Sequence, residues 1–322
     1  MEAYILKMEP ALKTKVWGGR RLETLGRSLP DSEFYGESWE VSGLEDGPSK
    51  IANGPLKSKT LIEASEILGE SLLGEHPVFP LLVKFLDARE DLSVQVHPGA
   101  RHIDEIRSKF GESADSKDEA WLILDADDEG SILWGVKEHI DSETMASALR
   151  EGTLVSYLRR IRVKKGDVFR VPPGTIHAIC AGVLLLEIQE PSDTTYRLYD
   201  YDRPGLDGEP RELHIEQALH VARRFPEDPT EVRCLDGEPL TDTRSVLLVD
   251  APTYRIERFQ LVDHSEALTL NAPGPYVLTV LEGHIWLNDV ELRDWDSAVI
   301  PAQFSNVHVQ GSGTFVLSAA RS

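Results

Sequence analysis

Cysteine is almost missing from this chain, which has two, Cys180 and Cys234, among 322 residues. Two separated cysteines exclude a disulfide-dense scaffold and a cysteine-rich zinc site. Long apolar runs are missing too, because none approaches the about 18 residues of a membrane-spanning helix. The first residues lack the apolar stretch of a signal peptide. We therefore expect a cytoplasmic protein with no membrane partner.

Positive charge is also scarce. The chain has 34 Lys and Arg against 55 Asp and Glu, which gives a formal net charge of −21. A negative field over the whole molecule opposes binding to polyanions, so we expect no nucleic-acid partner. The 41% of hydrophobic residues is typical of a globular protein, and the length suits one large domain or two modest ones.

Predicted strands outnumber predicted helices. Helical patterns occur at 59–73, with Ser58 as a possible N-cap, and at 103–110, 142–150 and 212–224. Strand patterns occur at 81–86, 92–97, 120–124, 132–134, 160–164, 168–171, 176–180 and 184–189. Helices lie between groups of strands instead of alternating with them, which argues against a doubly wound sheet.

A segment rich in Pro, Asp, Glu and Thr, residues 226–245, is predicted to be a linker. After it the chain is strand-like at 254–262, 276–281, 284–287, 297–300, 306–309 and 314–319. Short strands at even spacing predict a second, smaller β-sandwich or barrel.

The most informative segment is residues 166–177, GDVFRVPPGTIH. It predicts a turn, a short apolar strand, a second turn at Pro172 and Gly174, and a strand that presents His177. This pattern resembles the second motif of the cupin family, double-stranded β-barrels that often hold a metal in the barrel mouth. A lone histidine beside a turn is more often structural, but the full pattern favours a ligand.

An upstream strand at 92–97 supplies a partner. Its residues alternate between an apolar set and a polar set, the latter being Ser93, Gln95 and His97. The polar set faces either solvent or the interior of a barrel. We favour the interior, because an exposed edge more often carries Lys or Glu.

A carboxylate follows at 117–121, KDEAW, where a period of two puts Lys117 and Glu119 on one face. Such a pair is ordinarily a solvated ion pair. Two histidines, a glutamate and a glutamine nevertheless form a sensible ligand set for zinc or another divalent metal.

Together these stretches resemble the type I mannose-6-phosphate isomerases (phosphomannose isomerases) in their short bacterial form. The resemblance runs in family order from residue 16 to 214 and covers the remainder only in architecture. The matching stretches are 16–19 (VWGG), 82–84 (LVK), 93–98 (SVQVHP), 117–121 (KDEAW), 173–178 (PGTIHA), 187–203 and 210–214 (PRELH).

The resemblance implies a mainly β fold of two cupin (jelly-roll) barrels, with helical insertions in the first. The metal-binding catalytic domain would span 1–235, and a degenerate domain without metal would span 236–322. In the second domain Asn306 stands where the first motif has His177. The oligomeric state would be a monomer or a homodimer.

The family's zinc ligands fall on Gln95, His97, Glu119 and His177, with Gln95 the least dependable. The catalytic arginine falls on Arg197 and an active-site acid on Glu187. The substrate contacts, with Arg203 added as a further phosphate donor, are Trp17, Lys84, Ser93, Lys117 and Arg203. Independently, Lys84 interrupts an apolar strand, and a buried lysine without a partner is costly, which favours an anion-binding interior.

The implied reaction is the zinc-dependent interconversion of mannose 6-phosphate and fructose 6-phosphate through an enediolate. Glu187 is the favoured base, with a hydroxide on the metal, His97 and Lys117 left open as alternatives. Arg197 stays protonated and would stabilise charge and orient substrate. Two other classes compete: a non-catalytic cupin that binds a sugar phosphate, and an iron cupin oxygenase. The oxygenase usually has histidine where Gln95 stands.

Overall fold

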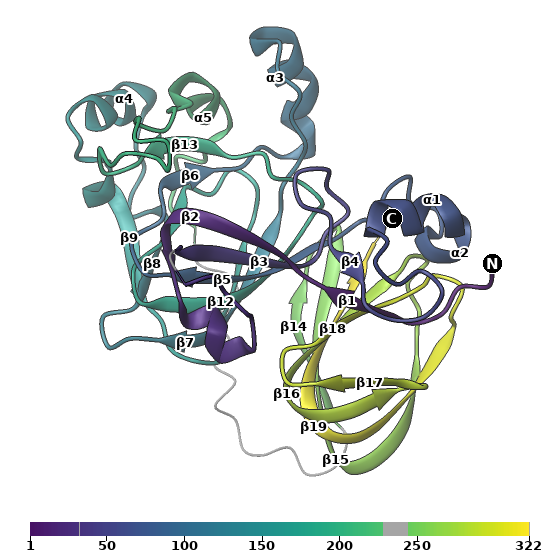
Figure 1. Cartoon of the computed structure of the whole chain (residues 1–322). Helices are drawn as coiled ribbons and strands as arrows, with labels where there is room; N and C mark the ends of the chain where they lie inside the picture. The colour runs from purple at the N-terminus through teal and green to yellow at the C-terminus, as the bar shows by residue number, and fades with distance from the viewer. Residues whose placement is uncertain (32, 228–243, 322) are drawn as a thin grey trace.

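The structure is a computed structural model that describes residues 1–31, 33–227 and 244–321 (Figure 1). Most of the predicted linker at 226–245 lies outside these residues. The described chain is mainly β, as the sequence predicts. No helix in the described ranges has the length and apolar character that crossing a membrane requires.

Two of the sheets share the N-terminal two thirds of the chain. A six-stranded sheet has the order β10-β7-β12-β5-β2-β3. Its strands are β2 (Ala11–Gly19), β3 (Tyr35–Val41), β5 (Leu82–Ala88), β7 (Glu119–Ala126), β10 (Val168–Val171) and β12 (Val183–Gln189). A five-stranded sheet has the order β13-β6-β11-β8-β9. Its strands are β6 (Val94–Val96), β8 (Ser131–Val136), β9 (Leu158–Arg162), β11 (His177–Ile179) and β13 (Tyr196–Tyr199).

The third sheet is built mainly from the C-terminal part of the chain. Its main path is β14-β15-β19-β16-β18-β1-β4, and β17 pairs with β16. Its strands are β1 (Leu6–Glu9), β4 (Lys50–Ile51), β14 (Arg244–Asp250), β15 (Tyr254–Thr269), β16 (Tyr276–Leu287), β17 (Val290–Arg293), β18 (Ser297–Ile300) and β19 (Asn306–Ala320). Several of these strands are longer than predicted, since the predicted pairs 276–281 and 284–287, and 306–309 and 314–319, are continuous. The N-terminal strand β1 pairs with β18, so the two ends of the chain share this sheet.

The helices are α1 (Leu61–Leu68), α2 (Glu70–Leu73), α3 (Ile103–Phe110), α4 (Ser142–Arg150) and α5 (Ile215–Val221). Helices α3, α4 and α5 gather at one end of the molecule, beside β6 and β13 (Figure 1). The predicted helix at 59–73 is divided at Gly69, whose φ is 52°. The prediction of Ser58 as its N-cap is wrong: Thr60 forms a capping box with Glu63, and Ser58 has a φ of 70°.

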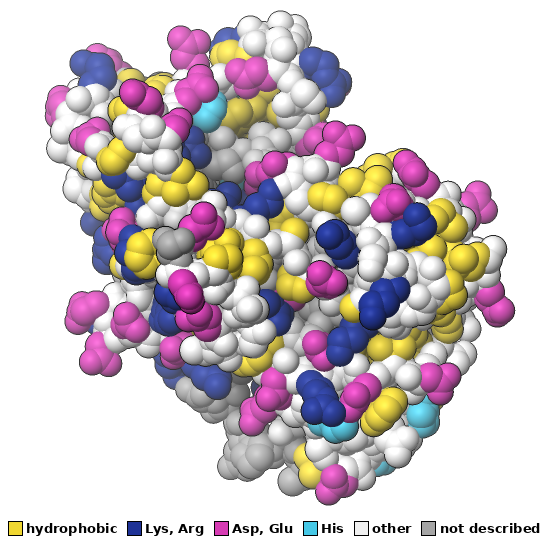
Figure 2. All heavy atoms as spheres, in the orientation of Figure 1, with side chains coloured by type: hydrophobic (Ala, Val, Ile, Leu, Met, Phe, Trp, Pro, Cys, Tyr) yellow, Lys and Arg dark blue, Asp and Glu magenta, His cyan; other side chains and the backbone are white. Residues whose placement is uncertain are grey.

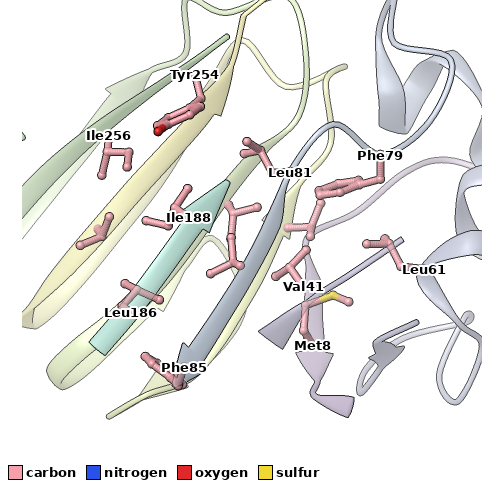
Figure 3. Close-up of a cluster of buried hydrophobic side chains, with 14 of the residues drawn as sticks. Met8, Val41, Leu61, Phe79, Leu81, Phe85, Leu186, Ile188, Tyr254 and Ile256 are labelled. Carbon is pink, nitrogen blue, oxygen red and sulfur yellow. The ribbon is translucent and has the colours of Figure 1, made fainter. Parts of the chain in front are cut away.

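One buried cluster joins the N-terminal and C-terminal sheets. It includes Phe85, Leu186 and Ile188 from the six-stranded sheet, and Tyr254 and Ile256 from β15 (Figure 3). The register of the six-stranded sheet sets Glu187 on β12 opposite Lys84 on β5 and Trp121 on β7. Since alternate residues of a strand face opposite sides, Glu187 turns away from the face that buries Leu186 and Ile188.

Candidate metal centre and active site

Three predicted ligands, His97, Glu119 and His177, meet inside the protein and offer atoms within 4.8 Å of one another. The His177 Nε2 lies 3.2 Å from Glu119 Oε1, and the His97 Nε2 lies 3.4 Å from Glu119 Oε2. Each side chain is about 1% exposed. One carboxylate therefore faces two imidazoles from different parts of the five-stranded sheet: His97 directly follows β6, and His177 begins β11.

Backbone carbonyls fix the orientation of both rings. His97 Nδ1 lies 2.8 Å from the Thr194 carbonyl oxygen, and His177 Nδ1 lies 2.9 Å from that of Thr175. A ring that donates its Nδ1 proton to a carbonyl presents the lone pair of Nε2, which is the usual arrangement of a metal-binding histidine. Burial, and for His97 also the Lys117 charge, lowers the pKa of both, that of His97 to about 3. Neutral imidazoles are the form that binds a metal.

The fourth predicted ligand, Gln95, lies beside this group. Its Nε2 is 3.3 Å from His177 Nε2, and its Oε1 accepts a hydrogen bond from Ser93 Oγ at 3.3 Å. Pairing of β6 with β11 places Gln95 directly opposite His177. The alternation of 92–97 thus brings Ser93, Gln95 and His97 to one side, as predicted.

The donor set fits a metal ion. Both oxygens of the buried Glu119 carboxylate lack a hydrogen bond, although the Lys117 Nζ lies 2.8 Å from Oε2. A buried carboxylate that accepts no hydrogen bond is costly even beside one ammonium group, and a cation bound by it and by two imidazoles would lower that cost. Two imidazole nitrogens and a carboxylate suit zinc and other divalent metals, and Gln95 would add an oxygen only with its amide turned over, since its Nε2 is the atom that faces His177.

A cavity of about 210 Å³ lies next to this group. Of the predicted site residues it contains seven: Trp17, Lys84, Ser93, Gln95, Lys117, Glu187 and Arg197. The sequence thus located much of the wall of the cavity. The other residues that line it are Lys15, Glu37, Leu86, Leu92, Ile179, Asp193, Thr195 and Arg211.

Buried charges of alternating sign line one wall. Lys84 Nζ lies 3.0 Å from Glu187 Oε1, and Lys117 Nζ lies 3.8 Å from the same oxygen. Burial and the Glu119 charge raise the pKa of Glu187, against the opposite effect of the two lysines. Burial also raises the pKa of Glu37, but the charges of Lys84 and Lys15 lower it more, and it falls to about 2.

The predicted arginines occupy different places. Arg197 lines the cavity, donates from Nη1 to the Glu212 carbonyl oxygen at 2.8 Å, and has a buried Nε without a hydrogen bond. Arg203 instead binds the Asp200 carboxylate with Nε and Nη2, at 3.1 and 2.9 Å. Arg211 also binds Asp200, and it is this arginine that reaches the cavity wall.

Comparison with known proteins decides the family. Residues 5–120 match the family model of the phosphomannose isomerase type I catalytic domain. A putative mannose-6-phosphate isomerase YvyI of Bacillus subtilis is 36% identical over an alignment of 323 positions that covers 97% of this chain and 97% of the other. The chain belongs to the type I phosphomannose isomerase family. The mannose-6-phosphate isomerase ManA of B. subtilis is 37% identical over 86% of this chain and 85% of its own.

Solved structures of the family share the fold. A mannose 6-phosphate isomerase of B. subtilis superposes with a TM-score of 0.84 at 33% identity, over 98% of this chain and 100% of the other. The apo enzyme of Salmonella typhimurium, at 17% identity, has a TM-score of 0.76 over 99% of this chain and 100% of its own. The predicted family resemblance and the assignment to a class of isomerases are therefore confirmed.

Several residues that line the cavity of this phosphomannose isomerase family member were not predicted from its sequence. Lys15 and Glu37 stand on β2 and β3, which the sequence did not predict as strands. Residues 35–41, YGESWEV, are all buried. A charged residue in a buried strand needs a partner, so Glu37 indicates a functional site for the same reason that Lys84 does. Trp121 is buried and donates from Nε1 to Glu187 Oε2 at 2.8 Å.

Proposed function

We propose that this protein interconverts mannose 6-phosphate and fructose 6-phosphate and depends on one zinc ion. His97, Glu119 and His177 would hold the ion, with Gln95 as a fourth ligand. The observation that carries the proposal is the buried His–Glu–His group beside a cavity rich in cationic side chains. Three B. subtilis relatives and one of Streptococcus mutans, all with mannose-6-phosphate isomerase in their names, support the substrate.

An aldose–ketose isomerase moves a proton between C1 and C2 of an open-chain sugar, and negative charge develops on the neighbouring oxygens. A bound zinc ion would supply electrostatic stabilisation of that charge. Glu187 is our candidate for the base that carries the proton, since its Oε1 is buried, lacks a hydrogen bond and borders the cavity. Trp121 and Lys84 hold this carboxylate in place from two neighbouring strands.

The phosphate group of the substrate requires cationic partners, and the wall of the cavity supplies them. Lys15, Lys84, Lys117, Arg197 and Arg211 face Glu37, Glu187 and Asp193, which leaves an excess of positive charge. Lys84 and Lys117 are already paired with carboxylates. Arg197, with its free Nε, is the group best placed to orient the substrate and stabilise charge.

The net charge of −21 does not oppose this substrate. Acidic and basic side chains are interspersed over the face of the molecule seen in Figure 2. On this face the acidic side chains are spread out, and a dianion of six carbons requires only a few cations collected in one cavity.

The division into two domains, the oligomeric state and the cellular location are part of the same proposal. We interpret residues 1–235 and 236–322 as two cupin barrels, the second without metal, in a cytoplasmic monomer or homodimer. Asn306, which replaces the first motif's histidine, stands exposed at the start of β19.

The experiment is a coupled assay in which purified protein is supplied with zinc and mannose 6-phosphate. Fructose 6-phosphate is followed through glucose-6-phosphate isomerase and dehydrogenase as NADPH. We expect turnover on mannose 6-phosphate and none on unphosphorylated mannose at the same concentration. Saturable binding of mannose 6-phosphate without turnover would instead establish the non-catalytic sugar-phosphate-binding cupin.

A further inference from the structure

Tyr254 connects the C-terminal sheet to the neighbourhood of the metal centre. It is the first residue of β15, and its side chain is fully buried among residues of both parts of the chain. Figure 3 shows its ring beside β12, the strand that carries Leu186 and Ile188. Its hydroxyl donates a hydrogen bond to Asp118 Oδ1 at 2.8 Å.

Asp118 is held from several sides. Besides Tyr254, Arg170 on β10 donates from Nε to Oδ1 at 3.1 Å and from Nη2 to Oδ2 at 2.6 Å. The backbone N–H of Asp118 donates to Glu190 Oε2 at 2.9 Å, and its carbonyl oxygen accepts from the Glu190 N–H at 3.1 Å. Side chain and backbone of this residue are thus fixed together.

This matters because Asp118 stands between Lys117 and Glu119. In an extended segment adjacent side chains face opposite sides, so anchoring Asp118 toward β10 and β15 points its two neighbours into the site. The direction of the Glu119 carboxylate toward His97 and His177 therefore depends on how firmly Asp118 is held. Asp118 does not bond a ligand itself; it acts on Glu119 through the backbone that joins them, in the same sense in which hydrogen-bond partners of ligands set ligand geometry.

We propose that Tyr254 is a positioning residue for the metal centre. Through Asp118, the C-terminal sheet holds the segment that carries Lys117 and Glu119, although that sheet would contribute no ligand of its own. The inference rests on the proposed role of Glu119 as a metal ligand. It gives the C-terminal part of the chain a task in metal binding.

The test compares Tyr254→Phe with Tyr276→Phe. Tyr276 is a matched control, because it is a buried tyrosine of the same sheet that packs in a separate cluster. Its hydroxyl also forms a hydrogen bond, which it accepts from the Ala272 N–H at 2.6 Å. Zinc affinity is measured by competition with a chromophoric chelator, and the visible absorption of the cobalt-loaded protein reports ligand geometry. We expect Tyr254→Phe to weaken zinc binding by at most about 10-fold, the lower end for a group that bonds a ligand directly, because Tyr254 acts through Asp118, and to alter the cobalt spectrum. Tyr276→Phe should change neither.

Urea unfolding of both metal-free variants separates this effect from general destabilisation. Wild-type zinc affinity and an unchanged cobalt spectrum in Tyr254→Phe would overturn the positioning role alone and leave the proposed function standing. A wild-type protein that bound neither metal would overturn both. If Tyr254→Phe does not fold, Asp118→Asn replaces it as the test variant, because it removes the charge that Arg170 and Tyr254 hold. We expect the same weakened zinc affinity in Asp118→Asn. Wild-type zinc affinity in that variant would refute the inference.

Discussion

The ammonium of Lys84 and the carboxylate of Glu187 form an ion pair of 3.0 Å across directly opposed positions of β5 and β12, each side chain only 4% exposed. Burial lowers the pKa of Lys84, but the charges of Glu187 and Glu37 raise it above its usual value. The lysine that looked anomalous in an apolar strand is thus compensated by two carboxylates. A buried pair of this kind is a poor source of stability but a precise way to hold a carboxylate in a cavity.

Glu187→Gln should separate catalysis from folding. The amide keeps the shape of the side chain but cannot accept a proton, so we expect kcat to fall by about 10²- to 10⁴-fold. Because the pKa of Glu187 is raised in the folded protein, a neutral side chain is accommodated there at least as well as a charged one, and the free energy of unfolding should change little. Steady-state kinetics and urea unfolding measure the two quantities.

The matched control is Glu40→Gln. Glu40 is also a buried carboxylate on β3 paired with an arginine, Arg27, at 2.6 Å, but it does not line the cavity. Burial raises the pKa of Glu40, as it does that of Glu187, so this variant too should change little in stability, and it should keep its kcat. Equal losses of kcat in the two variants would show that Glu187 acts only through the fold.

Arg197→Ala should keep the metal and lose most turnover. Its guanidinium borders the cavity. Within the described residues it forms no hydrogen bond or ion pair with His97, Glu119 or His177. We therefore expect one zinc per chain by elemental analysis, together with a fall in kcat/KM of at least about 100-fold. Arg162→Ala, which removes an exposed arginine paired with Glu129, should leave both unchanged. A drop in zinc content would reassign Arg197 to a structural role.

Glu37 makes the free energy of unfolding depend on pH in the acid range. Its pKa is about 2 in the folded protein against 4.5 in the ordinary carboxyl group. Because the folded state favours the ionised form, the contribution of Glu37 is complete above pH 4.5 and is lost as pH falls toward 2. The free energy of unfolding of wild type minus that of Glu37→Gln should thus fall by about 1.4 kcal/mol for each pH unit below 4.5.

Urea unfolding of the two proteins between pH 3 and 6 checks this slope. The subtraction removes the contributions of carboxylates that both proteins share. A difference that stayed constant from pH 6 to 3 would mean that the positive charges of Lys15 and Lys84 do not act on Glu37 as described.

Local patterns were enough to find much of the site. A period of two put Gln95 with His97, and Lys117 with Glu119, on one face of their segments, because this signal depends only on neighbouring residues. The choice of these residues and of His177 as ligands came from the resemblance to the cupin motif and to the isomerase family. The bounds of the long strands were not predicted correctly. β16 and β19 continue through Gly283 and Gly311–Gly313, which lie between the predicted segments, and glycine inside a strand is uncommon. Local patterns do not predict contacts between distant segments, such as the hydrogen bond between Tyr254 and Asp118. For the same reason they did not predict that Arg211, and not Arg203, lines the cavity.

Asn306→Ala tests the assignment of one metal to the N-terminal part of the chain. Asn306 is exposed, and its Nδ2 donates only to the neighbouring Ser305 Oγ among the described hydrogen bonds. Zinc content and kcat/KM should both equal those of wild type. A variant that had lost zinc would place a ligand in the C-terminal sheet.

The account depends most on a metal held by His97, Glu119 and His177, and one measurement tests it directly. Wild type and His177→Ala are stripped with a chelator, dialysed and assayed on mannose 6-phosphate while zinc is added back, with bound zinc determined in the same samples. We predict that stripped wild type is inactive and regains full turnover as one zinc per chain binds, whereas His177→Ala binds zinc poorly and stays inactive. Full activity in the stripped protein, or in His177→Ala, would contradict the account.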